Sequence, residues 1–153
     1  MTIEAPQMDT KMGDRVETIR VMLVDDREAM REGLRLMLSG DESIRVIGTA
    51  RNGQEAIARA KKISPDIILM DIAVPGVDGM EAVRNIKESQ PQVSVIVISD
   101  NRKYLAPAIQ AGAVGFLARN IGRSELVAAI RLIYLWRLVL FDENGAQFAL
   151  VRL

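Results

Sequence analysis

Short apolar runs alternate along this chain with longer segments of helical periodicity, and this alternation constrains the fold more than any other feature. The apolar runs lie at residues 21–24, 46–47, 67–70, 93–98 and 115–117. Each run is typical of a buried strand. Strict alternation of strands and helices favours right-handed βαβ units and a parallel sheet that is covered on both faces. We therefore predict a single doubly wound α/β domain with five strands.

The segments between the runs carry apolar residues on one helical face. These residues are Met30, Leu34, Met37 and Leu38 in the first segment, Ile57 and Ala60 in the second, and Ala82, Val83 and Ile86 in the third. A fourth helix is expected over 104–111, with Pro107 in its first turn, and a fifth opens near Ser124. In the fifth helix, the spacing of Arg131 and Arg137 predicts a solvent-exposed edge.

The composition excludes several classes of chemistry. The chain has no cysteine and no histidine, so thiol catalysis, cysteine zinc sites and a histidine base are ruled out. Its 20 basic and 20 acidic residues cancel, so no overall field favours nucleic acid or anionic lipid. No apolar stretch reaches the roughly 18 residues of a membrane span. We expect a cytoplasmic protein without a role at the membrane.

Acidic residues follow the predicted strands at the point where each strand ends. Asp25 and Asp26 follow the first strand, Asp71 follows the third, and Ser99 and Asp100 follow the fourth. Ligands of doubly wound sheets bind at this edge, so the first three carboxylates should converge there. Because like charges at about 4 Å repel strongly, a bound cation would stabilise the cluster. Oxygen ligands favour a hard ion such as Mg²⁺, or Mn²⁺.

Such a cluster suits phosphoryl chemistry. An aspartate screened by a metal ion can attack phosphorus and form an acyl phosphate, which makes Asp71 the candidate nucleophile. Ser99 could donate to the oxygens of the transferred group, and Arg119, after the fifth strand, could balance its charge.

Each of these residues also has a structural interpretation when it is considered alone. Asp26 would cap the helix that follows it, Ser99 would be a strand-end hydroxyl, and Arg119 would be a solvated surface cation. The functional interpretation depends on finding these residue types together at one edge of the sheet.

Four segments resemble the receiver domains of bacterial two-component response regulators. They are VMLVDDREAMREGL, PDIILMDIAVPGVDGMEAV, VIVIS and AGAVGFLAR, and the resemblance covers residues 20–134. Its specific elements are the paired acids Asp25 and Asp26, the acceptor pattern from Asp71 through Pro75 to Asp78-Gly79, the hydroxyl of Ser99 and the aromatic Phe116.

The resemblance implies a flavodoxin-like, CheY-like fold with strand order 2-1-3-4-5. It implies that Asp26, Asp71 and the backbone carbonyl of Ala73 hold Mg²⁺ with help from Asp25. It also implies that a histidine kinase or a phosphotransfer protein phosphorylates Asp71. Ser99 and Phe116 would then shift inward and change the face formed by the fourth helix, the fifth strand and the fifth helix. That face is a candidate homodimer surface.

The chain departs from the family pattern at three points. Arg119 stands where the family has lysine, Asp100 stands where a small residue is usual, and the segment between Ser99 and Arg119 is shorter than expected. Two functions therefore stay open: a receiver phosphorylated on Asp71, and an atypical receiver that acts as an interaction or dimerisation module without phosphorylation. A phosphohydrolase with an aspartate nucleophile is disfavoured, because its acid/base position is occupied by Ala73.

The ends of the chain lie outside the resemblance. Residues 1–18 are polar and aperiodic, which predicts a flexible leader, and we assign the receiver domain to 19–137. Residues 138–153 form two apolar runs around Asp-Glu-Asn-Gly, a pattern that favours a hairpin or a remnant of a linker. This segment could extend the edge of the sheet, pair with a second chain or stay disordered. Leu132, Leu135 and Trp136 make the fifth helix apolar over more of its circumference than one core face requires, which favours a dimer or partner surface, or a core covered by this tail. The chain would be either a stand-alone receiver or the regulatory half of a transcription regulator. We expect it neither to bind DNA directly nor to act as an enzyme on a separate substrate.

Overall fold

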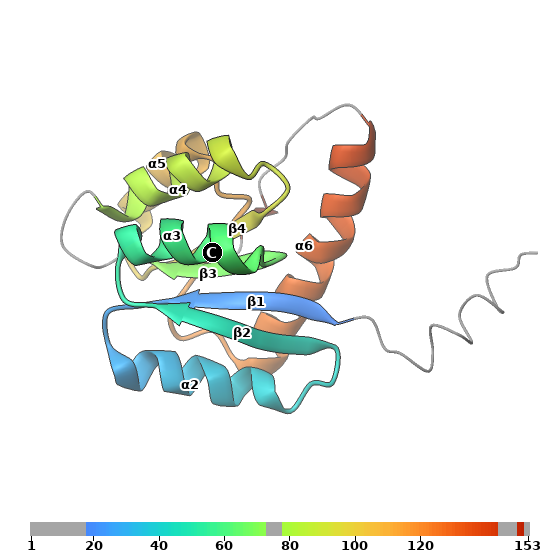
Figure 1. Ribbon diagram of the computed structural model, residues 1–153. Helices are drawn as coiled ribbons and strands as arrows, with labels where there is room; N and C mark the ends of the chain where they lie inside the picture. Colours follow the sequence, from blue (N-terminus) through green and yellow to red (C-terminus); the bar gives the residue numbers. More distant parts are fainter. Residues whose placement is uncertain (1–17, 73–77, 144–149, 152–153) are drawn as a thin grey trace, which may run out of the picture.

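The computed structural model contains one sheet with helices on both faces (Figure 1). It describes residues 18–72, 78–143 and 150–151. The sheet has six strands in the order β2-β1-β3-β4-β5-β6, and every neighbouring pair is parallel. The first five strands follow the predicted order 2-1-3-4-5, which confirms the flavodoxin-like prediction.

The strands lie where the apolar runs predict them. They are β1 (Ile19–Val24), β2 (Ile44–Ala50), β3 (Ile67–Asp71), β4 (Ser94–Ile98), β5 (Gly115–Leu117) and β6 (Leu150–Val151). Every residue of β3 and of β4 is buried. Central strands of a parallel sheet are covered on both faces, which explains why these two runs do not alternate between apolar and polar residues.

The helices connect consecutive strands, as crossovers require. They are α2 (Glu28–Ser39), α3 (Gly53–Ile63), α4 (Asp78–Ser89), α5 (Leu105–Ala111) and α6 (Arg123–Glu143), and a short 3₁₀ turn at Arg102–Tyr104 precedes α5. The side chain of Asn52 accepts a hydrogen bond from the Glu55 N–H and so caps α3. Gly112, with φ of 116°, ends α5 in the left-handed region that glycine tolerates best.

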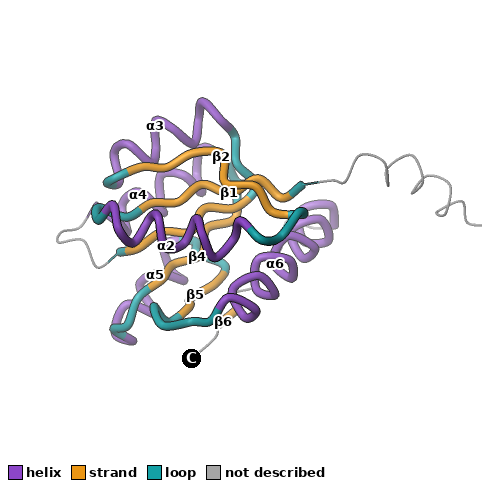
Figure 2. The backbone as a smooth tube through the Cα atoms, turned by 90° about the horizontal axis from the view of Figure 1, so that it is seen from below, coloured by secondary structure: helices purple, strands orange, loops and turns teal. Residues whose placement is uncertain are grey.

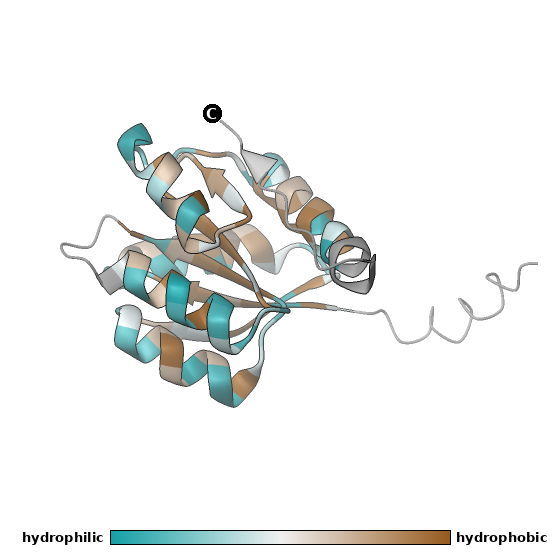
Figure 3. Ribbon diagram, turned by 90° about the horizontal axis from the view of Figure 1, so that it is seen from above, coloured by the Kyte–Doolittle hydropathy of each residue, from teal (hydrophilic) through white to brown (hydrophobic). Residues whose placement is uncertain are grey.

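Two apolar clusters lie on opposite faces of the sheet. The helices α2 and α6 cover one face, and α3, α4 and α5 cover the other (Figure 2). Leu38 of α2 and Leu126, Ile130 and Ile133 of α6 belong to the first cluster. The strands between the layers are the most hydrophobic part of the chain (Figure 3). The prediction of a sheet with two covered faces is therefore confirmed.

The C-terminal segment differs from the predicted hairpin. Helix α6 continues to Glu143, so residues 138–143 are helical and do not form a first strand. Strand β6 pairs with β5 in parallel, through Gly115↔Leu150 and Phe116↔Val151, whereas a hairpin requires antiparallel strands. The apolar run after Trp136 fits a helix as well as a strand, which is why its pattern did not distinguish the two.

Helix α6 also differs from prediction at Arg137. The Arg137 side chain is only 18% exposed, and its Nη2 lies 3.2 Å from Oδ1 of Asp66. Arg131 lies on the exposed edge, as predicted, and pairs with Asp41 at 2.6 Å. The exposed-edge prediction therefore holds for Arg131 and is wrong for Arg137. In the described part of the helix, Leu132, Leu135 and Trp136 are exposed apolar side chains.

Candidate functional site

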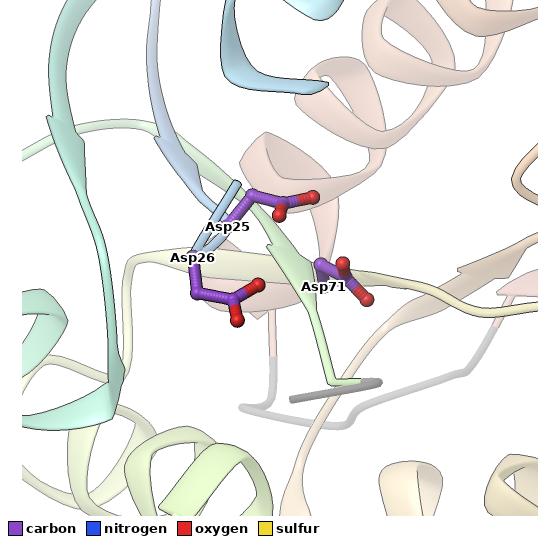
Figure 4. A group of neighbouring side chains, drawn as sticks. All are labelled: Asp25, Asp26 and Asp71. Carbon is purple, nitrogen blue, oxygen red and sulfur yellow. The ribbon is translucent and has the colours of Figure 1, made fainter. Parts of the chain in front are cut away.

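Three carboxylates meet at the carboxyl ends of β1 and β3 (Figure 4). Asp25 and Asp26 directly follow β1, and Asp71 is the last residue of β3. The two strands are neighbours in the sheet, so their ends bring these residues together. One oxygen from each carboxylate lies within 4.8 Å of the others. The predicted convergence is observed.

Burial divides the cluster. Asp25 and Asp71 are buried, whereas Asp26 is exposed. Burial of a charged carboxylate is costly unless it is paired and hydrogen-bonded. The site must therefore supply positive charge to Asp71, or admit it from solvent.

Arg119 supplies part of that charge from the end of β5. Its Nη2 donates to Oδ1 of Asp71 at 2.8 Å and to Oδ2 at 2.7 Å. Its side chain is 16% exposed, against 4% for Asp71, so the pair is well shielded from water. Arg119 is therefore not a solvated surface cation, and its guanidinium lies at the position where it could balance a transferred phosphoryl group.

Arg27 supplies a second positive charge, and sequence reasoning missed it. Its Nη2 donates to Oδ2 of Asp71 at 3.0 Å, and its Nε and Nη2 lie 3.3 and 3.4 Å from the two oxygens of Asp25. The hydrogen bond with Asp25, followed by the charges of Asp25 and Asp71, raises the pKa of the Arg27 guanidinium. The available signal was its position directly after the paired acids.

The turn between β1 and α2 also shows how the acids are held. Arg27 is the N-cap residue of α2 and makes no side-chain cap, so the interpretation of Asp26 as a helix cap is wrong. Asp25 orders this turn: its Oδ1 accepts from the backbone N–H of Arg27 at 2.9 Å. Its backbone carbonyl accepts from Nη1 of Arg31 at 2.7 Å.

Ser99 follows β4 and is buried. Its hydroxyl oxygen accepts a hydrogen bond from the Asn101 N–H at 3.0 Å. A hydroxyl that accepts one bond still has a proton to donate, so this contact is compatible with the predicted role. The same contact is also what a structural strand-end hydroxyl would make.

Asp100 joins the ends of β4 and β5. Its Oδ1 accepts from the backbone N–H of Arg119 at 3.0 Å. This hydrogen bond holds one carboxylate oxygen against the backbone that carries the Arg119 guanidinium. The acidic residue that departs from the family pattern thus has a structural contact.

Phe116 lies apart from the acidic cluster. It is a buried residue of β5 and packs in the cluster that includes Ala108 and Ala111 of α5. It pairs with Val97 of β4 on one side and with Val151 of β6 on the other. Phe116 therefore lies in the sheet and packs in the apolar cluster that α5 covers. Ala73 and Pro75 lie outside the described residues.

No helix in the described part of the chain combines the length and apolarity that crossing a membrane requires.

Comparison with known proteins agrees with the fold. The family model of the response regulator receiver domain matches residues 21–131. The chain is 34% identical over 134 residues to response regulator GacA of Pseudomonas viridiflava, covering 86% of this chain and 63% of that protein. It is 36% identical over 134 residues to response regulator UvrY of Escherichia coli, covering 86% of this chain and 62% of that protein.

Solved structures give the same result. A two-component response regulator of the LuxR family from Aurantimonas superposes with a TM-score of 0.74 at 32% identity, covering 79% of this chain and 88% of that one. The response regulator domain of Thermotoga maritima CheB superposes with a TM-score of 0.72 at 30% identity, covering 78% of this chain and 98% of that one.

The chain belongs to the response regulator receiver domain family. It is a receiver domain of the kind found in two-component response regulators, as its sequence resemblance predicted. It spans less than two thirds of the length of the GacA and UvrY relatives.

Proposed function

We propose that this receiver accepts a phosphoryl group on Asp71 from a histidine kinase or a phosphotransfer protein, with Mg²⁺ or Mn²⁺ bound nearby. The observation that supports this most directly is the buried Asp71 carboxylate, with oxygens of Asp25 and Asp26 within 4.8 Å and the Arg119 guanidinium bonded to it at 2.7 Å. The site combines a nucleophile, an acidic cluster that can bind a cation, and an anion-binding side chain.

The transfer itself would be a displacement at phosphorus. A carboxylate oxygen of Asp71 forms a bond to phosphorus as the bond from phosphorus to the donor's imidazole nitrogen breaks, and the electron pair of that bond stays on the nitrogen. Arg119 would turn from the carboxylate to the oxygens of the transferred group, and the Ser99 hydroxyl would donate a hydrogen bond to one of them.

The acidic cluster fits a hard divalent cation. Asp25, Asp26 and Asp71 offer carboxylate oxygens close together, which is the donor set that Mg²⁺ takes in proteins. When bound, such an ion neutralises charge on the phosphoryl oxygens. The Ala73 carbonyl is a further proposed ligand that rests on the family resemblance alone.

The output would pass through the face formed by α5, β5 and α6. Phe116 lies under this face, and Leu132, Leu135 and Trp136 expose apolar area on α6. We propose that phosphorylation changes this surface through Ser99 and Phe116 and controls a partner or a homodimer. The domain would then act in the cytoplasm as a signalling module that assists only its own phosphorylation and dephosphorylation. In a transcription regulator, DNA binding would belong to another domain.

A second candidate is a receiver that works without phosphorylation. The contacts of Arg27 and Arg119 with Asp71 favour it, because both guanidiniums hold the carboxylate that would have to attack phosphorus. In this alternative the Asp71 cluster stabilises the fold, and the α5, β5 and α6 face binds its partner constitutively.

The experiment that separates the two candidates is phosphorylation by a small donor. We expect acetyl phosphate with Mg²⁺ to add one phosphoryl group, measured as the mass of the intact protein, and Asp71→Asn to abolish the adduct. An unmodified wild-type protein, with its fold intact by circular dichroism, would contradict the proposal and favour the second candidate.

A further inference from the structure

Arg27 contacts all three members of the acidic cluster. Besides its bonds to Asp71 at 3.0 Å and to Asp25 at 3.3 and 3.4 Å, its Nε lies 3.9 Å from Oδ1 of Asp26. We infer that Arg27 is a tethered competitor of the divalent cation, so that its guanidinium must leave the cluster before the metal ion binds. This inference rests on the proposed function.

Arg27 and the metal ion would need the same oxygens. Mg²⁺ binds carboxylate oxygens at about 2.0–2.1 Å in near-octahedral geometry and tolerates little distortion. Guanidinium donors that point at Asp25 and Asp71 occupy the lone pairs that face the cluster, and the positive charges of the two cations repel each other at this range. Joint occupancy is therefore unfavourable.

The two arginines at Asp71 differ in how easily they can leave. The Arg119 side chain is 16% exposed, and the backbone of Arg119 is bonded to Asp100. The Arg27 side chain is 48% exposed, and Arg27 lies in the connection between β1 and α2, directly before the helix. Water can solvate the Arg27 guanidinium as it leaves, so Arg27 is the group that a metal ion would displace, while Arg119 stays for the phosphoryl group.

Exchange of this kind would set the metal affinity. Each opening of Arg27 costs the free energy of its ion pairs, which are partly solvated and therefore modest in strength. Removing the guanidinium should tighten Mg²⁺ binding by about three- to tenfold. Arg27 would also keep the buried carboxylates neutralised when magnesium is scarce.

The test is a calorimetric titration of the full chain with Mg²⁺ alone. It compares wild type with Arg27→Gln and with Arg35→Gln. The second variant is the matched control, because it removes one positive charge from α2, where Arg35 pairs with Glu32 at 3.7 Å and not with the acidic cluster. Asp26→Asn identifies the binding event as that of the acidic cluster. Thermal unfolding with and without Mg²⁺ gives a second readout and reports whether each variant is folded.

We expect Arg27→Gln to bind Mg²⁺ more tightly than wild type and to gain more thermal stability from it, with Arg35→Gln unchanged. Arg27→Lys, which keeps the charge and loses the planar fork, should lie between wild type and Arg27→Gln. Equal affinity of wild type and Arg27→Gln, both abolished by Asp26→Asn, would overturn the inference and leave the proposed metal site standing. Absence of Mg²⁺ binding in both proteins would overturn the inference together with that metal site.

Discussion

The two edges of the sheet use the same kinds of charged residue in different ways. At the carboxyl edge, the charged side chains bind mainly to each other, Asp71 to Arg27 and Arg119 and Asp25 to Arg27, although Asp25 and Asp100 also accept backbone N–H groups. At the amino edge, charged side chains bind mainly to the backbone. There, Oδ2 of Asp66 accepts the Arg20 N–H at 2.8 Å.

Further contacts at the amino edge follow the same rule. The Arg20 guanidinium donates to the carbonyls of Ile63, at 2.7 Å, and Ser64. Nζ of Lys87 donates to the carbonyls of Pro91 and Val93, both at 2.9 Å. Arg137 adds a bond from Nε to the Gln92 carbonyl at 3.2 Å.

The two kinds of bond differ in how easily one partner can be exchanged for another. A bond from a side chain to a backbone group fixes the chain, because its partner cannot be exchanged without unfolding a turn. A bond between two charged side chains can be exchanged for a metal ion or a phosphoryl group at low cost. The amino edge therefore stabilises the fold, and the carboxyl edge is suited to bind and to switch.

Apart from the loss of the acceptor Asp71 itself, the largest effect should come from Asp26→Asn at the carboxyl edge. Loss of this carboxylate weakens the metal site, and we expect phosphorylation by acetyl phosphate with Mg²⁺ to slow by about 100-fold. The initial rate of adduct formation, followed by intact mass, measures it. Glu32→Gln removes an exposed carboxylate from α2 and should leave the rate unchanged. A rate for Asp26→Asn within twofold of wild type would show that the edges do not differ as described.

The matching change at the amino edge is Asp66→Ala. It leaves the Arg20 N–H without its acceptor and Arg137 without its carboxylate, so we expect the free energy of unfolding to fall by about 1–3 kcal/mol. Urea unfolding measures this loss. The phosphorylation rate should remain that of wild type, and a rate that falls in parallel with stability would argue against separate roles.

Lys87 gives a pH test of the amino edge. Burial lowers its pKa from 10.5 to about 8, so between these values the unfolded chain holds a proton that the folded chain has released. Folding is therefore favoured as pH rises through this window. We expect wild type to gain on the order of 1–3 kcal/mol relative to Lys87→Met from pH 8 to 10.5. If the free energies of unfolding of wild type and Lys87→Met, measured in urea, changed in parallel across this window, the lowered pKa of Lys87 would be contradicted.

The smallest effect should be that of Asp100→Asn. This change removes a negative charge that would repel an incoming phosphoryl group, and it keeps a carbonyl oxygen that can accept the Arg119 N–H. We expect adduct formation to accelerate by about two- to fivefold, with the stability nearly unchanged. A slower rate would instead indicate that the charge of Asp100 assists the site.

The sequence predicted those parts of the fold that depend on local patterns. Continuous apolar runs identified β3 and β4 because both strands are buried, and the acids that follow β1 and β3 met because strand ends of a parallel sheet share one edge.

Features that depend on distant partners were not predictable. Arg137 pairs with Asp66, which lies 71 positions earlier in the chain, so its periodicity alone indicated an exposed edge. Arg27 was missed because its contact with Asp71 depends on the side-chain conformation in one turn. The end of helix α6 was misassigned to a strand because the apolar residues that follow Trp136 fit both periods equally, whereas strand β6 extends the edge of the sheet, which is one of the alternatives left open.

The proposal that Asp71 accepts the phosphoryl group is tested most directly by locating that group in the chain. Borohydride reduces an aspartyl phosphate to homoserine, so peptide mapping after treatment with acetyl phosphate and Mg²⁺ identifies the acceptor. We expect homoserine at position 71 alone. Homoserine at Asp26, Asp66 or Asp100, or a phosphoryl group that resists reduction and maps to a hydroxyl side chain, would contradict it.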